Sequence, residues 1–318
     1  MKTCLIFGHN GLDLDVTINI RSLYKNIGFN VFFSDKLFNA DVLVILRPID
    51  KEINFTQFNF SLIHVYDYVG NNFDNLIVCL PKNKTFIFCT TSETKKRLID
   101  FFNFPSSKIF VAFVPVDVKI WAKKIKPLKY DLVHIGNFKK NILNDDLTNK
   151  FYDLVKSFKV HIWGAGWMPK TELSHGKTSV FKVSKIYSSS RFALGLMYPF
   201  QRNCTYSGRF WHAPLNGCLV FSEPGYFTRL VPGVYELNYF SSELPALINS
   251  MKINRFNLQS EAIVFWQKEY NVVKEYILSS LNNIEFGEKR FRKFIYYLSI
   301  NIYNELQIFY HKVRSQLF

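Results

Sequence analysis

The sequence predicts an α/β protein made of two Rossmann-like halves, each a parallel sheet covered by helices. Short apolar runs alternate with helical stretches over residues 1–116, and the same alternation restarts at residue 130. The strand-like runs are apolar throughout, which is typical of strands buried on both faces of a parallel sheet. Between the two series lies DVKIWAKKIKPLK (117–129), which is basic, contains Pro127 and has little strand signal. We interpret it as a linker.

The first half opens with TCLIFG (3–8), a buried strand. The loop HNGLDLD and a helix over 16–27 follow, and Gly28 ends the helix. A second helix is expected over ETKKRLIDFF (93–102). The other expected strands are NVFFSD (30–35), ADVLVILRP (40–48), SLIHVYDY (61–68), NLIVCL (75–80), TFIFCTTS (85–92) and KIFVAFVPV (108–116).

The second half repeats a strand followed by a glycine turn. Its central segment, SGRFWHAPLNGCLVFSEPG (207–225), reads as a loop, a helix from Arg209 to Gly217, a short apolar strand and a turn. The other expected strands are YDLVHIGNF (130–138), KVHIWGAGW (159–167) and FALGLMY (192–198). The other expected helices are 147–158, 183–191, one that starts within 241–248, and 260–278, where apolar residues recur at helical spacing.

The composition favours a packed globular protein and argues against disulfide-rich, metal-binding and membrane-spanning classes. The chain has 318 residues and 48% apolar content, enough for two packed domains. Five scattered cysteines without a CxxC pair, and seven histidines without ligand spacing, favour reduced thiols and no metal site. No apolar run is long enough for a signal peptide or a membrane span, so a cytoplasmic protein is expected. The net charge of +15 attracts nucleotides, nucleic acids or an anionic membrane face.

The order of these segments resembles the GT-B nucleotide-sugar glycosyltransferases. The stretch 90–121 resembles the end of their N-terminal domain, 130–141 their donor loop, and 207–225 their diphosphate-binding segment. The resemblance covers residues 85–250 well and the first 84 only as a fold pattern. It implies two Rossmann-like domains facing a cleft: an acceptor-side domain over 1–120 and a nucleotide-sugar-binding domain over 130–260. The C-terminal helices, 261–318, would cross back onto the N-terminal domain.

Arg209 is the first candidate for donor binding. A cation beside a helix N-terminus suits a diphosphate, and a bidentate guanidinium could stabilise the leaving diphosphate without a metal. Ser207 stands in the same loop. The alternative for Arg209 is a structural salt bridge or cap.

Gly136 and Asn137 follow a strand, at the end where α/β proteins place ligands. Glycine lets a phosphate approach the backbone amides, and Lys139 and Lys140 could neutralise it. The alternative is a solvated turn with two surface lysines.

The resemblance implies two further donor contacts. Lys182 and Val183 stand in the segment that reads the base. The family has a Glu three residues after the arginine, where it binds the ribose hydroxyls, and this chain has His212 instead. An imidazole can still hydrogen-bond a hydroxyl, or His212 packs on its helix.

Asp67, just past a strand in HVYDYVGN, is the first candidate for the base that takes the acceptor proton. Asp13 in the first loop is the second, and Asp15, His9 and His64 are weaker. Helix capping or turn formation is the alternative for each Asp. The sequence leaves inversion or retention of the anomeric carbon open, and retention needs no such base.

These observations favour a metal-independent hexosyltransferase that uses a UDP-sugar, with a GDP-sugar as the alternative donor. Its acceptor would be a glycan or glycolipid of bacterial surface polysaccharide type, at the inner membrane face. A second hypothesis is a DNA-modifying enzyme, since Asp67 and the Arg209–Trp211 pair also resemble phage glucosyltransferases that modify hydroxymethylated bases. A third is a non-catalytic binding protein, because the family Glu is absent at 212. The basic, aromatic tail 289–318 could contact a membrane, but packing on the N-terminal domain is favoured.

Overall fold

The computed structural model describes two compact units. The described residues are 2–7, 14–34, 40–46, 53–65, 71–137, 149, 153–155, 157–167, 173–196, 207–237 and 243–281. Among them, unit 1 comprises residues up to Asp117 together with those from Gln267 onward, and unit 2 comprises Val118–Trp266. No helix in these ranges combines the length and the apolar character needed to cross a membrane.

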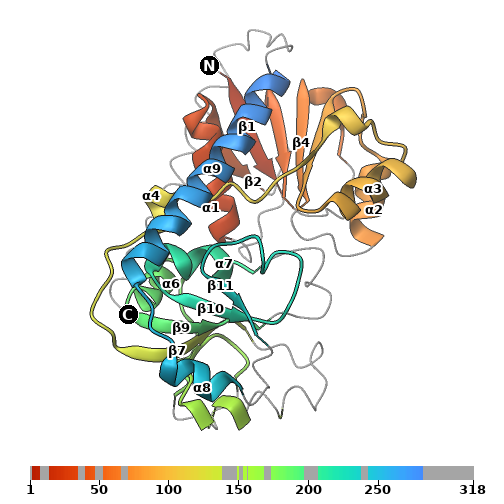
Figure 1. Ribbon diagram of the computed structural model, residues 1–318. Coiled ribbons are helices and arrows are strands. Elements are labelled where there is room, and N and C mark those ends of the chain that lie inside the picture. The colour runs from red at the N-terminus through yellow and green to blue at the C-terminus, as the bar shows by residue number, and fades with distance from the viewer. Residues whose placement is uncertain are drawn as a thin grey trace. The chain divides into compact units, whose positions relative to one another are not determined.

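Unit 1 contains one sheet in which all neighbouring strands run parallel (Figure 1). The strand order is β2-β1-β3-β4-β5-β6. The chain leaves β1 toward β2 on one side and returns to β3 on the other, which is the strand order of a doubly wound fold. The strands are β1 (Thr3–Phe7), β2 (Asn30–Ser34), β3 (Val42–Ile45), β4 (Phe60–Val65), β5 (Thr85–Cys89) and β6 (Ile109–Val111).

Helices cover both faces of this sheet, because alternate strand residues point to opposite sides. Ile63 and Val65 of β4 share a core cluster with the helices α2 and α3. On the other face, His64 of β4 meets Tyr24 of α1, and Phe110 of β6 meets Tyr276 of α9. The helices of this unit are α1 (Leu14–Asn26), α2 (Asn71–Val78), α3 (Ser92–Asp100) and the second part of α9 (Arg255–Leu281). The single-turn 3-10 helices are η1 (Phe55–Gln57) and η2 (Ser106–Lys108).

One expected strand of unit 1 is wrong. The run NLIVCL (75–80) belongs mostly to the helix α2. Its buried residues are Phe73, Leu76, Ile77 and Leu80, a helical spacing, whereas Val78 is 70% exposed. The apolar content of a short run does not distinguish a helix from a strand. The spacing of its buried residues does.

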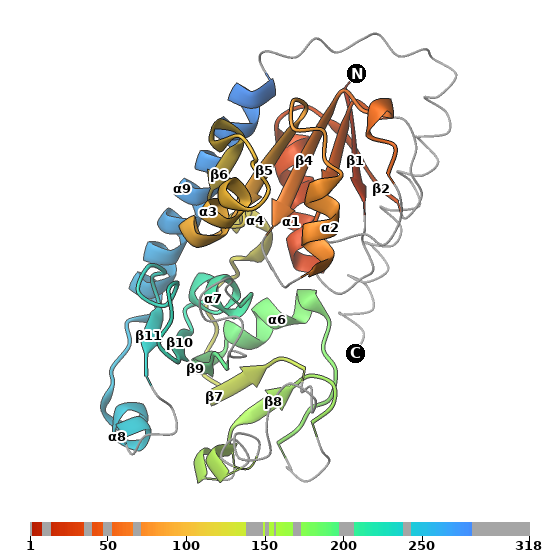
Figure 2. The ribbon, with the colours of Figure 1, turned by 90° about the vertical axis from the view of Figure 1, so that its right-hand side faces the viewer.

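Unit 2 contains a second sheet whose neighbouring strands are also all parallel (Figure 2). The order is β11-β10-β9-β7-β8, so the chain passes from β7 to β8 on one side and then to β9 on the other. The side of the sheet on which successive strands are added therefore reverses between β7 and β9, although all the strands run parallel. The strands are β7 (Tyr130–Ile135), β8 (His161–Trp163), β9 (Ser190–Leu194), β10 (Leu219–Ser222) and β11 (Val234–Glu236).

The helices of unit 2 differ in extent from the expectation. The helix expected over 183–191 begins at Val180 and ends at Tyr187, and Ser190 already belongs to β9. The helix expected from Arg209 to Gly217 is a four-residue α-helix followed by a 3-10 turn at Pro214, which has no N–H to donate. The helices are α4 (Val118–Trp121), α6 (Val180–Tyr187), α7 (Arg209–His212), η4 (Pro214–Asn216), α8 (Glu243–Ser250) and the first part of α9. The described residues within 149–158 are helical.

Two wholly parallel sheets with helices between their strands confirm the predicted α/β class.

Candidate functional site

Arg209 lies across the point where the second sheet reverses its winding. Its Nε donates to the carbonyl oxygen of Ile135 at 2.7 Å, at the carboxyl end of β7. Its Nη1 donates to the carbonyl oxygen of Leu196 at 2.8 Å, just past β9, and to Ser207 Oγ at 3.0 Å. These three acceptors are neutral, so they orient the guanidinium without cancelling its charge. Ligands of open α/β sheets bind outside the carboxyl ends of the strands at such a reversal.

Two glycines make room for this arrangement. A Cβ on Gly136 would lie 2.2 Å from Arg209 Nη2, so any larger residue would displace the guanidinium. A Cβ on Gly164 would lie 1.9 Å from the backbone oxygen of Gly136, which cannot move aside as a side chain can. Gly136 N also donates to the Trp163 carbonyl oxygen at 2.8 Å. The turns after β7 and β8 are therefore packed backbone to backbone.

Side chains fix the same two turns. Asn137 Oδ1 accepts a hydrogen bond from Ala165 N at 2.8 Å, and Trp167 Nε1 donates to the Gly136 carbonyl oxygen at 2.6 Å. Trp167 is 8% exposed and belongs to the core cluster of this unit. The turn beside Arg209 is thus held from the core side.

His134, near the end of β7, is a buried neutral base next to this cation. Its Nδ1 lies 3.1 Å from the Leu194 carbonyl oxygen, and because a carbonyl only accepts, Nδ1 carries the proton. Burial lowers the pKa of His134 well below its usual value, and the Arg209 charge lowers it further. Burial likewise raises the pKa of the Tyr187 hydroxyl on α6, and the Arg209 charge opposes that rise. Arg209 therefore supplies the positive charge, and His134 adds none.

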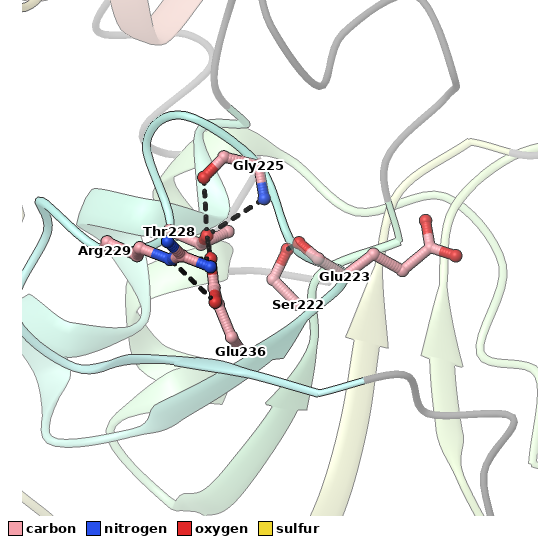
Figure 3. A network of polar contacts seen from close by, with 6 residues as sticks. All are labelled: Ser222, Glu223, Gly225, Thr228, Arg229 and Glu236. Carbon is pink, nitrogen blue, oxygen red and sulfur yellow. Dashed lines mark hydrogen bonds and ion pairs between the residues drawn. The ribbon is translucent and has the colours of Figure 1, made fainter.

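A hydrogen bond also connects the carboxyl end of β10 to the residue just past β9, at the same edge of the sheet. Ser222 Oγ donates to the Gly195 carbonyl oxygen at 3.3 Å, immediately past β9. Beyond it, Thr228 Oγ1 accepts from Gly225 N at 3.1 Å and lies 2.5 Å from Glu236 Oε1 (Figure 3). Arg229 Nε donates to both oxygens of Glu236, at 3.1 and 3.0 Å.

The Thr228 hydrogen bond and Arg229 lower the pKa of Glu236. In Figure 3 the side chain of Glu223 points away from this network.

The structure brings part of the predicted set together. Ser207, Arg209 and Gly136 meet at the reversal point, and Asn137 braces the adjoining turn.

Three other predicted residues lie on the helices α6 and α7. Lys182 and Val183 lie on α6, where Lys182 N donates to Ser179 O in the first helical turn. His212 is 3% exposed, and its ring meets the edge of Trp121 at a centroid distance of 4.7 Å. These contacts put the imidazole of His212 among aromatic rings.

Three candidates for the catalytic base, Asp67, Asp13 and His9, lie outside the described residues. Lys139 and Lys140, predicted to neutralise the phosphate, lie outside them as well. Asp15 lies inside the first turn of α1, where its Oδ1 accepts from Val16 N at 2.9 Å. His64 is fully buried between Tyr24 and Phe88, and burial lowers its pKa to about 3. Across the described part of the chain, no cluster of three His, Cys, Asp or Glu residues is placed to hold a metal ion.

Sequence reasoning missed His134, Gly164 and Trp167. A signal for them exists, because the strings HIG (134–136) and HIWG (161–164) both place a glycine directly after the end of a strand. The carboxyl ends of parallel strands are where open α/β sheets bind ligands, so glycine turns there point to the site.

Comparison with known proteins gives structural likenesses only. No protein-family model and no curated protein matches the chain by sequence. AviGT4, a glycosyltransferase involved in avilamycin A biosynthesis, is similar in structure with a TM-score of 0.58 and 12% identity, over 89% of this chain and 98% of that one. T4 phage BGT in complex with its UDP-glucose substrate gives 0.57 and 12%, over 89% and 100%.

An α-glucosyltransferase in complex with UDP-glucose and DNA containing an abasic site gives a TM-score of 0.55 and 11% identity, over 85% of this chain and 94% of that one. At such identities the likeness concerns the fold. The chain therefore has the GT-B fold: its two sheets are wholly parallel, the strand order reverses beside Arg209, and the similar structures share this arrangement.

Proposed function

We propose that this protein transfers a sugar from a nucleotide-diphosphate sugar, with a UDP-sugar as donor. The observation that carries the proposal is Arg209, anchored by the carbonyl oxygens of Ile135 and Leu196 at the reversal point of the second sheet. Two of the similar structures hold UDP-glucose. The donor would lie along the carboxyl ends of β7, β9 and β10, with its diphosphate beside Arg209.

The proposed chemistry needs a group that stabilises charge on the departing diphosphate. Arg209 supplies it through a guanidinium that neutral acceptors have already oriented, so little reorganisation is needed during reaction. Gly136 would let the phosphates approach the turn closely and Asn137 would bring its backbone amide to them, with Lys139 and Lys140 adding charge. Lys182 and Val183 would read the base and His212 the ribose. Asp67, or Asp13 in its place, would take the acceptor proton without a metal.

The first candidate for the acceptor is a glycan or glycolipid, with the protein acting in the cytoplasm or peripherally at the inner membrane face. A specific observation favours duplex DNA as the second. One similar structure holds both UDP-glucose and DNA, and this chain carries a net charge of +15. Transfer to DNA would weaken steeply with added salt, whereas transfer to a neutral glycan would not.

The test is thermal unfolding with UDP, GDP, CMP, ADP and TDP, each with a divalent metal or with a chelator. Stabilisation by UDP that the chelator does not remove supports the proposed donor and metal independence. Arg209→Ala should abolish the shift and lower the turnover of UDP-sugar at least ~100-fold.

The matched control is Arg191→Ala in the same unit, because Arg191 Nη2 donates to the Met251 carbonyl oxygen away from the β7 turn. Loss of the UDP shift in both variants would mean a general loss of folding. No shift with any nucleotide would leave the non-catalytic binding protein as the better reading.

A further inference from the structure

A basic surface of unit 2, away from the β7 turn, is formed by the linker after Asp117 and by the start of α9. Residues 118–130 and 251–260 contain seven Lys and Arg and no Asp or Glu. Within these stretches, residues 125–128 and 252–256 line an open hollow of ≈ 770 Å³ in unit 2, whose apolar lining includes Ile125, Pro127, Leu128, Ile253 and Phe256. We call this surface the linker patch and define its exposed members as Lys124, Lys126, Lys252, Leu128 and Phe256.

The backbone of the linker patch is held firmly. Arg255 donates from Nη1 to the Lys126 carbonyl oxygen at 2.9 Å, and from Nε to that of Gly217 at 3.0 Å. Lys126 N donates to Ser188 O at 2.8 Å, and Gln259 Nε2 donates to Lys123 O at 2.7 Å. Because the main chain is tied inward at these points, the linker patch is a fixed surface and not a loose tether.

The side chains of the linker patch face solvent. Leu128 is 52% exposed and Phe256 is 67% exposed, among lysines that are exposed as well. Large exposed apolar residues surrounded by basic ones mark an interaction site, where binding removes the apolar side chains from water. Lysine stems can lie along an apolar layer while the ammonium groups remain at its polar boundary.

Charge complementarity selects the occupant. A second copy of the chain also carries +15, and the C-terminal segment 289–318 has six Lys and Arg against one Glu, so both would be repelled. An anionic lipid surface offers both negative headgroups and an apolar layer beneath them. Nucleic acid offers the charge but no layer for Leu128 and Phe256 to enter.

We propose that the linker patch is a membrane-docking surface that binds anionic lipid headgroups through Lys124, Lys126 and Lys252 while Leu128 and Phe256 enter the interface. It is independent of any donor bound at Arg209. Each lysine near such a surface contributes enough attraction that removing three lowers the partition coefficient about 100-fold.

The test uses the full chain with vesicles of phosphatidylcholine, alone or with about one third phosphatidylglycerol, in co-sedimentation at low and high salt. Binding only to the anionic vesicles, weakened by salt, is expected. Lys124→Gln, Lys126→Gln and Lys252→Gln together should lower the partition coefficient about 100-fold. The control removes the same charge from exposed lysines of unit 1, as Lys82→Gln, Lys84→Gln and Lys96→Gln, and should have a much smaller effect.

A second pair of variants separates lipid from nucleic acid. Leu128→Ser with Phe256→Ser keeps every charge and should lower vesicle binding about tenfold, while binding to a short duplex DNA stays unchanged. The matched control is Val78→Ser with Phe101→Ser, which are 70% and 78% exposed in unit 1.

Three results would overturn the proposal: equal binding to both vesicle types, equal losses in the control lysine variant, or vesicle binding that ignores the Leu128 and Phe256 changes. If the lysine variant loses DNA binding but keeps vesicle binding, the linker patch serves nucleic acid instead. Nucleotide binding measured on the same samples reports separately on the proposed donor site.

Discussion

Each unit has one buried histidine on a described strand of its sheet, and the two histidines differ in their surroundings. His64 on β4 and His134 on β7 are both essentially inaccessible, at 0% and 1% exposure, and burial lowers the pKa of each. His64 stacks on Phe88 and lies 3.2 Å from the Tyr24 hydroxyl, so its neighbours are core residues. His134 lies beside Arg209, two glycine turns and the end of β9.

The difference shows that burial and a shifted pKa do not by themselves mark a site. What marks the neighbourhood of His134 is a cation held by neutral acceptors, at the point where the strand order reverses. Matched substitutions of the two histidines, and of the turns and ion pairs in their units, test this difference.

The largest effect is expected from Gly164→Ala. The added Cβ would lie 1.9 Å from the Gly136 carbonyl oxygen, so the turn beside His134 must move. We expect unfolding free energy to fall by about 3 kcal/mol and UDP affinity to fall as well. Denaturant unfolding and calorimetric titration measure both. Gly28→Ala in unit 1 is the control, since it also has positive φ but no atom within 4 Å, and about 1 kcal/mol is expected. Equal losses would remove any special role of the turn.

The second effect is a pH dependence that both histidines should share. Each remains neutral when folded but takes up a proton when unfolded, so stability is lost as pH falls below about 6.5. For His64 the loss continues toward its folded pKa of about 3. Replacing either histidine by Phe should remove about 1.5 kcal/mol of the destabilisation between pH 6.5 and 5. Urea unfolding across that range tests it, and unchanged slopes in both variants would contradict the assigned protonation states.

The third effect separates the two histidines. His134→Phe places a larger ring against Gly136 and Arg209, and UDP affinity should fall about tenfold. His64→Phe should leave UDP affinity unchanged, because its contacts are with Tyr24 and Phe88. Titration calorimetry at neutral pH compares them. If both variants lose affinity equally, the assignment of the site to unit 2 fails.

The smallest effect concerns the surface ion pairs of the two units. Arg97 pairs with Asp74 at 3.0 Å in unit 1, and Arg229 pairs with Glu236 at 3.0 Å in unit 2, with both arginines well exposed. Replacing either arginine by Ala should change stability by about 0.5 kcal/mol at most. Double-mutant cycles at low and high salt measure the pairs. A loss several times larger for Arg229 would show that the Thr228–Glu236 network holds the loop after β10.

Much of the fold was predictable from the sequence, because buried parallel strands are apolar throughout and glycines follow them. The class, most strands and the start of α7 at Arg209 came from such patterns. The helix α2 was mistaken for a strand, since the five consecutive apolar residues 76–80 show no period until their burial is known.

Within the candidate site, Arg209, Ser207 and Gly136 were singled out by local pattern, and the structure brings them together. His134, Gly164 and Trp167 were missed because their roles depend on contacts between strands distant in sequence.

The division of the chain has a consequence for how it is made. Among the described residues, unit 2 is one continuous stretch, Val118–Trp266, whereas unit 1 needs both its N-terminal stretch and residues from Gln267 onward. Tyr270, which accepts from Asn26 Nδ2 at 2.6 Å, and Tyr276, which packs on Phe110, are among the last described residues to leave the ribosome.

Domains usually complete in the order of synthesis, but here the second unit can finish first. Until the second part of α9 emerges, the nascent first sheet would keep an apolar face open to chaperones.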